Sequence, residues 1–284
     1  MSIELRNVSH LYSKNSPFEK IALHNISLKI ETGDFVGLIG HTGSGKSTLI
    51  QHMNGLLSPS EGQILINGKD ITDKDIKMSD IRRMVGLVFQ YPEYQLFEET
   101  VYKDIAYGPK NIGMTDDEID KKVHEVIKIV GLKEKVLNKS PFELSGGQKR
   151  RVAIAGILAM DPEILILDEP TAGLDPKGRD DILLCLKKLH AEKNITIVLV
   201  SHSMEDIAKT VKNVIVMEDG SVKMQGSVKD IYKRGNELAK MGLDIPQVST
   251  VVNRLVERGI NIDKDTFTVE KAVDEIEKYI RGVK

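Results

Sequence analysis

The stretch GHTGSGKST at 40–48 constrains the fold of this chain more than any other segment. It contains the pattern G-x-x-x-x-G-K-[ST], with Gly40, Gly45, Lys46 and Ser47 at the fixed positions, and it continues the uncharged run FVGLIG at 35–40. Glycines let backbone N–H groups turn toward a phosphate, and a helix that follows directs its positive end at the same group. We therefore expect a buried strand, a phosphate-binding loop and a helix, in that order.

The side chains of this loop predict a nucleotide bound with Mg²⁺. Lys46 is expected to reach the β- and γ-phosphates, and the Ser47 hydroxyl is expected to ligate the metal. The nucleotide site is predicted to take in the whole loop, that is Gly40, His41, Thr42, Gly43, Ser44, Gly45, Lys46, Ser47 and Thr48.

A second motif, ILILDEP at 164–170, places two acids at the end of an apolar run. Asp168 is positioned to hold Mg²⁺ through water. Glu169 follows it and is expected on the opposite side of the strand end, where an unpaired buried acid would cost several kcal/mol. The functional interpretation of Glu169 is a general base, or an orienting group, for an attacking water.

The third motif is LSGGQ at 144–148, directly before the helical pattern KRRVAIAGILAM. Ser145 is a good N-cap residue, and Gly146 and Gly147 leave the start of the helix open to an anion. The chain therefore carries two helix ends suited to phosphate. The predicted signature site consists of Leu144, Ser145, Gly146, Gly147 and Gln148.

Strand-like and helix-like segments alternate through most of the chain, which predicts an α/β fold with a P-loop NTPase core and a doubly wound, mostly parallel sheet. An antiparallel β part is expected at the N-terminus, and the stretch 98–143 reads as a helical insertion. Strands are expected at 3–12, 21–30, 35–40, 85–90, 164–168 and 195–201, and helices at 46–56, 115–130, 146–160 and 176–192.

The last segment of the chain differs in character from the core. Residues 1–235 are expected to form the nucleotide-binding domain, with a helical subdomain at about 98–160, and residues 236–284 a helical extension. Apolar residues recur at helical spacing in that extension, with Val269, Val273, Ile276 and Ile280 on one stripe. The extension as a whole is interpreted either as an element that dimerises two ATPases or as an intramolecular cap on the sheet.

The composition excludes several classes of protein. Lys plus Arg (40) nearly balances Asp plus Glu (42), so bulk charge gives no reason to expect binding to nucleic acid. Cys185 is the single cysteine; it lies in an apolar stripe and is expected to be a core residue in a reducing compartment. The N-terminus does not resemble a signal peptide, and the apolar runs are too short to span a bilayer. A cytoplasmic chain is expected, attached to any membrane only through a partner.

The order of GHTGSGKST, Gln90, LSGGQ, ILILDEP, AGLD at 172–175 and His202 resembles the nucleotide-binding subunit of ATP-binding-cassette (ABC) transporters. The resemblance implies that Tyr12 stacks on adenine, Gln90 touches Mg²⁺, Asp175 crosses to a second subunit and His202 hydrogen-bonds the γ-phosphate. Taken alone, Tyr12 reads equally well as a core aromatic at a strand end, and a lone histidine is more often a surface or core residue.

In that family two such domains pair head to tail, and LSGGQ of one subunit clamps the ATP held by the other. The resemblance therefore implies a second ABC ATPase subunit as partner, in a homodimer or a heterodimer. Glu169 matches the catalytic acid of the family, so ATP hydrolysis is expected.

A finer resemblance rests on FQYPEYQLFEETV at 89–101, SPFELSGGQKRRVAIAGILAM at 140–160 and GLDIPQVSTVVNRLVERGI at 242–260. These stretches are similar to the ATPases of energy-coupling-factor (ECF) importers, and among them to the second (A′) type. Such importers take up vitamins or transition-metal ions and join two ATPases to a membrane coupling protein and a substrate-binding membrane protein. Cobalt and nickel importers use a closely related ATPase.

The resemblance implies that Tyr91, Tyr94, Leu96 and Phe97 contact the coupling protein at the cytoplasmic face of the membrane. Aromatic side chains give a large contact area with few rotors to order, and Glu93, Glu98 and Glu99 are expected to pair with arginines of a partner helix. Phe89, on the preceding strand, is expected in the core.

Three other functions are weighed against this one. The short tail and the sequence YPEYQLF disfavour a conventional ABC importer ATPase. The chain length and the balanced charge disfavour a soluble ABC ATPase that acts on nucleic acid. A nucleotide-gated scaffold without hydrolysis is disfavoured by Glu169 and His202.

Overall fold

The computed structural model describes residues 1–73 and 75–282. Its strands form two sheets, one of four strands in the order β2-β1-β4-β5 and one of six in the order β10-β9-β3-β8-β7-β6. The first is antiparallel and consists of β1 (Ile3–Tyr12), β2 (Lys20–Ile30), β4 (Glu61–Ile66) and β5 (Lys69–Asp70). The second consists of β3 (Phe35–Gly40), β6 (Val85–Val88), β7 (Ile164–Asp168), β8 (Thr196–Val200), β9 (Asn213–Glu218) and β10 (Ser221–Ser227).

The larger sheet is parallel except at one edge, where β10 runs antiparallel to β9. Its parallel strands are apolar on both faces, because successive side chains on a strand point to opposite sides and both sides are covered. In β8, Ile197 and Leu199 face one hydrophobic cluster while Val198 and Val200 face another. The α/β fold with a mostly parallel sheet is confirmed.

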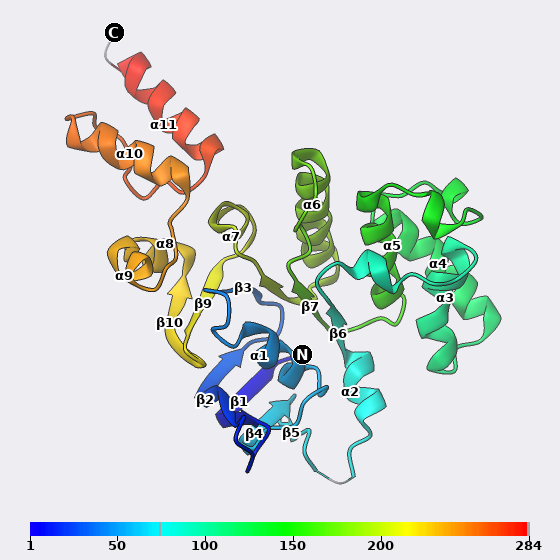
Figure 1. Ribbon diagram of the computed structural model, residues 1–284. Coiled ribbons are helices and arrows are strands. Elements are labelled where there is room, and N and C mark those ends of the chain that lie inside the picture. Colours follow the sequence, from blue (N-terminus) through cyan, green and yellow to red (C-terminus); the bar gives the residue numbers. More distant parts are fainter. Residues whose placement is uncertain (74, 283–284) are drawn as a thin grey trace.

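The two faces of this sheet are covered by different parts of the chain. One face packs against α1 (Lys46–Met53), α2 (Met78–Met84) and the antiparallel sheet. The other packs against helices that include α3 (Val101–Asn111), α4 (Asp116–Ile129), α5 (Gly146–Leu158), α6 (Pro176–Lys193), α7 (Met204–Thr210), α8 (Val228–Tyr232) and α9 (Gly235–Lys240). Figure 1 shows α3, α4 and α5 gathered to one side of the sheet.

The stretch between β6 and α5 is helical, as predicted: it holds α3, α4 and the 3₁₀ turns η1 (Pro92–Gln95), η2 (Glu134–Val136) and η3 (Pro141–Glu143). The structure adds four strands that the sequence reading does not predict, namely β4, β5, β9 and β10. Only Val214 to Met217 are fully buried in β9, and β10 is half-exposed and contains Gly226, so neither shows a long apolar run.

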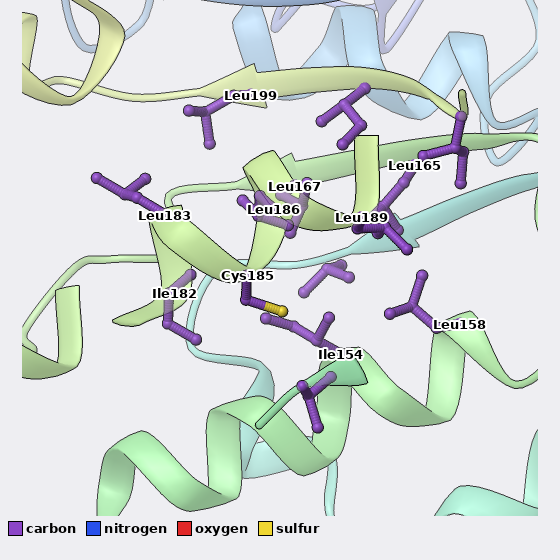
Figure 2. Close-up of a cluster of buried hydrophobic side chains, with 14 of the residues drawn as sticks. Ile154, Leu158, Leu165, Leu167, Ile182, Leu183, Cys185, Leu186, Leu189 and Leu199 are labelled. Carbon is purple, nitrogen blue, oxygen red and sulfur yellow. The ribbon is translucent and has the colours of Figure 1, made fainter. Parts of the chain in front are cut away.

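Cys185 lies in α6 inside the larger hydrophobic cluster, as predicted. Figure 2 shows it among aliphatic side chains that include Ile154 and Ile182. Its Sγ donates to the carbonyl oxygen of Ile129 at 3.3 Å, and burial raises the pKa of the thiol to about 11.

The C-terminal helices α10 (Gln247–Glu257) and α11 (Val269–Gly282) form a small core of their own around Val252, Ile262 and Ala272. In Figure 1 they extend away from both sheets. On the predicted stripe only Ile276 packs into this core, whereas Val269, Val273 and Ile280 are 55 %, 48 % and 57 % exposed. The exposed part of this stripe therefore does not cap the sheet, whereas Leu238, Leu243 and Phe267 of the same extension pack in or against the larger core.

Candidate functional site

The phosphate-binding loop joins β3 to α1, as predicted, and its shape requires glycine at two positions. Gly45 precedes α1 with φ of 100°, and a Cβ there would lie 2.7 Å from the carbonyl oxygen of Ala22. A Cβ on Gly40 would lie 2.4 Å from the carbonyl oxygen of Met217. The loop therefore lies against the neighbouring strands with no room for a side chain at either position.

Lys46 lies at the base of this loop. Its Nζ donates to the carbonyl oxygens of Gly40 (2.7 Å) and His41 (3.1 Å), and burial lowers the pKa of the ammonium group. A cation at the start of a helix, bonded only to backbone carbonyls, has charge left to offer an anion. The geometry of the loop fits a phosphate group.

A cavity of about 650 Å³ opens above the loop and brings distant parts of the sequence together. Tyr12, Gln90, Asp168, Glu169 and His202, predicted from separate motifs, all line it. Of the loop itself, Thr42, Gly43, Gly45, Lys46, Ser47 and Thr48 line the cavity, whereas Gly40, His41 and Ser44 do not.

Asp168 ends β7 on the side of the cavity nearest to α1. The Ser47 hydroxyl donates to its Oδ2 at 3.4 Å, and burial raises the pKa of the Asp168 carboxyl. A hydroxyl beside a carboxylate is a donor set that suits Mg²⁺, which takes oxygen ligands. Within the described residues no group of three or more His, Cys, Asp and Glu side chains could hold a metal alone, so phosphate and water oxygens would complete the coordination.

Glu169 follows Asp168 in a left-handed backbone conformation, with φ of 50°. Its Oε1 is buried and has no hydrogen-bond partner in the described part of the chain. Burial, together with the negative charge of Asp168, raises the pKa of Glu169 to about 7. A carboxyl group that exchanges its proton near neutral pH, beside a phosphate loop, is suited to accept a proton from water.

Two further side chains complete the walls of the cavity. Nε2 of His202 lies 3.6 Å from Oε1 of Glu169, and burial, followed by the charge of Lys46, lowers the pKa of the imidazole. Tyr12 is 39 % exposed, and its hydroxyl lies 3.3 Å from Oγ1 of Thr48. The alternative that Tyr12 is a core residue is wrong, because its ring faces the cavity rather than the packed interior.

The LSGGQ residues do not line this cavity. Ser145 caps α5 as predicted: its Oγ accepts from the Gln148 backbone N–H (3.4 Å), and Oε1 of Gln148 accepts from the Ser145 N–H (3.1 Å). A Cβ on Gly146 would meet no atom of the described residues within 4 Å, so this helix end is open. Asp175, also outside the cavity, caps α6 by accepting from the Gly178 N–H at 3.1 Å.

Sequence reasoning missed the residues that reach the cavity from β2 and from the β9–β10 turn: Lys20, Ile21, Ala22, Asp219 and Gly220. The Gly220 N–H donates to the carbonyl oxygen of Ser44 at 3.0 Å, which fixes the turn to the loop. The sequence signal for the turn was Asp-Gly between two apolar segments, a common hairpin turn.

Comparisons with known proteins agree with this site. The sequence model of the family described as ABC transporter matches residues 23–172, which include the phosphate loop, LSGGQ and both acids. The chain belongs to the ABC transporter family. It is 56 % identical to the energy-coupling factor transporter ATP-binding protein EcfA2 of Clostridium perfringens, over 99 % of both chains. It is 54 % identical to the protein of the same name from Caldanaerobacter subterraneus, over 100 % of this chain and 99 % of that one.

Solved structures of ABC ATPases share the fold. CbiO1 of Clostridium perfringens, described as part of the ABC transporter complex cbiONQ, superposes with a TM-score of 0.76 at 37 % identity, over 88 % of this chain and 98 % of that one. The ATP-binding cassette MJ0796, a dimer with ADP and phosphate, superposes with a TM-score of 0.71 at 34 % identity, over 80 % and 98 %. Among the described residues of this ABC ATPase, no helix is long and apolar enough to cross a membrane.

The aromatic segment 91–97 of this ABC ATPase lies between β6 and α3 and is mostly exposed. Tyr94 is 84 % exposed, Tyr91 and Phe97 are also exposed, and Phe97 packs edge-to-face on Tyr107 with ring centroids 4.9 Å apart. Leu96 is half-buried against the core. Phe89, as predicted, packs against the core.

The acids of this segment correct one expectation. Glu93 is not free to pair with a partner's arginine, because it forms a bidentate ion pair with Arg150 of α5. Glu99 pairs with Lys103 one helical turn away, at 2.5 Å on the surface. The prediction that Glu93 contacts a partner is wrong: its neighbour in space, Arg150, is 57 residues away in the chain.

Proposed function

We propose that this chain is the ATP-binding and ATP-hydrolysing subunit of an ECF-type importer, of the second (A′) type. The observation that carries the hydrolytic part is the convergence of Lys46, Glu169 and His202 on one cavity. The ECF part is supported by the curated relatives, which are about as long as this chain and bear that name. The importer would take up a vitamin or a transition-metal ion.

The geometry supports a role for each side chain that lines the cavity. Tyr12 stacks on the adenine, and Lys46 exchanges its bonds to backbone carbonyls for bonds to the β- and γ-phosphates. Ser47, Asp168 and Gln90 would hold Mg²⁺, which would supply positive charge to the phosphate oxygens. Each of these groups is already on the wall of the cavity, so little rearrangement precedes binding.

Hydrolysis then uses Glu169 and His202, which lie side by side on the wall of the cavity. Glu169 orients a water and accepts its proton as the water oxygen bonds to the γ-phosphorus and the bond to the bridging oxygen of ADP breaks. His202 donates a hydrogen bond to the γ-phosphate. The raised pKa of Glu169, about 7, matches a group that takes up a proton at neutral pH and releases it afterwards.

The open start of α5 supports a second ATPase subunit as partner. Ser145, Gly146 and Gly147 present backbone N–H groups and a positive helix end away from the chain's own cavity. Paired head to tail, this LSGGQ would contact the γ-phosphate of the ATP held by the partner, and the exposed Asp175 would cross the same interface. We infer a homodimer or a heterodimer of ABC ATPases, without nucleic acid.

The exposed aromatic segment supports attachment to a membrane partner at the cytoplasmic face. Tyr91, Tyr94 and Phe97 present exposed aromatic rings whose side chains have few rotatable bonds to immobilise on binding, which is typical of interface anchors. Leu96 contributes from the edge, where it is half-buried. The membrane coupling protein would bind here, and the substrate-binding membrane protein would be reached only through it.

The proposed function is tested by Glu169→Gln in the assembled membrane complex. The isosteric amide keeps the shape of the site but cannot accept the proton, so steady-state ATP turnover is expected to fall by about 10² to 10⁴-fold while ATP binding persists. Mass spectrometry of proteins that copurify with the wild-type chain is expected to identify a second ABC ATPase and two membrane proteins. Retained turnover would refute the role of Glu169, and the absence of membrane proteins would refute the importer.

A further inference from the structure

Arg150 is the largest of the fully buried side chains, with 1 % exposure. It lies in α5, two residues after Gln148. A buried guanidinium is tolerated only where its N–H groups are satisfied, because an unpaired charge in a protein interior is strongly destabilising. The partners of Arg150 therefore show which parts of the chain it holds together.

The first set of partners follows Glu169 in the chain. Nη1 of Arg150 donates to the carbonyl oxygens of Pro170 (3.0 Å) and Ala172 (2.6 Å). These bonds fix the backbone that leaves Glu169, whose φ of 50° is uncommon for a residue with a side chain and persists only where the surroundings impose it. Arg150 is part of those surroundings.

The second set of partners belongs to the aromatic segment. Nε and Nη2 of Arg150 donate to the two carboxylate oxygens of Glu93, at 2.9 and 2.6 Å. Paired N–H groups on a carboxylate fix orientation as well as distance. The ring of Tyr91 lies over the same guanidinium, with its centroid 5.8 Å away. One side chain thus bridges the turn η1, which carries Glu93, to the loop that carries Glu169.

We propose that Arg150 is a positioning residue that transmits the placement of segment 91–97 to Glu169. The proposal rests on the proposed docking function of this segment. A partner that binds the exposed rings of Tyr94 and Phe97 sets the position of η1, and Glu93 moves with it. The planar guanidinium follows the carboxylate, and the carbonyl oxygens of Pro170 and Ala172 follow the guanidinium.

This route differs from one through the Gln90 side chain. Gln90, directly before the segment, lines the cavity, whereas Arg150 does not line it and bonds to the backbone that follows Glu169. The membrane partner would thereby affect the geometry of the proposed base as well as the metal site. Docking would change the rate of hydrolysis more than it changes the affinity for ATP.

The test compares Glu93→Gln with the wild type, each in the full complex and as the ATPase without the membrane proteins. The amide keeps the shape of Glu93 but removes the charge that locks the guanidinium. The ratio of kcat with membrane partner to kcat without it is expected to fall by about 10-fold, the scale of a small misplacement of a catalytic group. The KM for ATP and the yield of complex are expected to change by less than about 2-fold.

A purely structural role predicts a different result. If Glu93→Gln lowers the Tm and both rates together but leaves the kcat ratio at its wild-type value, the proposal is overturned. Arg150→Lys keeps the charge but not the planar guanidinium, and it is expected to lower the kcat ratio by the same factor as Glu93→Gln. If this variant does not fold, Glu93→Gln decides the question alone.

A matched control replaces a carboxylate elsewhere in the chain, Glu125 on α4. Glu125→Gln breaks ion pairs with Lys122 and Lys193 but touches neither Arg150 nor the loop after Glu169, so the kcat ratio is expected to stay at the wild-type value. A loss as large as that of Glu93→Gln would contradict the proposal. A wild-type chain that does not copurify with membrane proteins would instead contradict the docking function, which keeps the two failures distinct.

Discussion

The imidazole of His202 lies beside the carboxyl group of Glu169, with 3.6 Å between Nε2 and Oε1. Among the described residues that oxygen has no hydrogen-bond partner, although it is buried. The two groups come from the ends of adjacent parallel strands, β7 and β8, which deliver their following residues to the same edge of the sheet. This distance is longer than an ordinary hydrogen bond, so both groups keep hydrogen-bonding capacity to offer to a reacting phosphate or water in the cavity that they line.

Replacing His202 by alanine is expected to lower ATP turnover without preventing ATP binding. The side chain is half-exposed, so its loss would remove the proposed hydrogen bond to the γ-phosphate at little cost in fold stability. We expect kcat to fall by about 10²-fold, with an ATP Kd within a few-fold of the wild type. His24→Ala, at an exposed position on β2, is the control and should leave both values unchanged. A parallel fall in affinity would contradict the assignment.

Gly220→Ala is expected to weaken ATP binding. The residue has φ of 71°, and a Cβ would lie 2.7 Å from the carbonyl oxygen of Ala22, so the turn that holds Ser44 must shift. Gly68→Ala is the matched control, because Gly68 has φ of 75° but no atom of the described residues within 4 Å of its Cβ. Isothermal titration calorimetry with ATP should show a loss of affinity for Gly220→Ala but not for Gly68→Ala. Equal losses would mean that backbone strain, rather than contact with the loop, is responsible.

Cys185 is expected to resist alkylation in the folded chain. Burial raises its thiol pKa to about 11, so at pH 8 the reactive thiolate is scarce, and the side chain is enclosed by the core. Iodoacetamide followed by mass spectrometry should find the native chain unmodified and the chain in guanidinium chloride fully modified. Rapid labelling of the native chain would show that α6 separates from the core.

Exposed residues on α11 provide a test of the predicted dimerisation role of the C-terminal extension. Val273→Lys with Ile280→Lys is expected to keep the Tm but weaken association of ATPase subunits, measured by light scattering with ATP and Glu169→Gln present. Both side chains are about half-exposed, so the change costs little within one chain. Leu184→Lys, at 52 % exposure on α6, is the control. Undiminished association would assign the stripe to another partner.

Tyr94→Ala with Phe97→Ala is expected to reduce copurification with the membrane coupling protein by about 10-fold or more, because exposed aromatic anchors carry much of the energy of an interface. ATP binding should persist, since neither ring lines the nucleotide cavity. Phe18→Ala offers a control with a comparably exposed ring, in the loop between β1 and β2. An unchanged yield of complex would remove the segment from the interface.

Residues whose role follows from local sequence could be predicted. Lys46 and Ser47 begin a helix after a buried strand, and Ser145 caps α5, because glycine geometry and side-chain capping act over a few residues. The predicted strands β3, β7 and β8 likewise show their burial as uninterrupted apolar runs. For such segments the short-range pattern is sufficient.

Residues placed by long-range contacts could not be predicted. Asp219 and Gly220 reach the cavity because β9 pairs with β3, and nothing near them in the sequence encodes that pairing. Glu93 was expected at an interface because its neighbours are exposed aromatics, yet Arg150 satisfies it from another helix. An ion pair requires only that its two residues be close in space, whatever their separation in the chain. A prediction based on neighbours in the chain therefore places an acid such as Glu93 on the surface.

The separation of the LSGGQ helix end from the chain's own phosphate loop has a genetic consequence. Under the proposed head-to-tail pairing, damage to Lys46 and damage to Ser145 disable different halves of a composite site. In a homodimer, a chain with one defect mixed with a chain carrying the other would rebuild one intact site, whereas two copies of the same defect would rebuild none. Alleles of this gene would then sort into two complementation groups divided by the face of the protein that they alter.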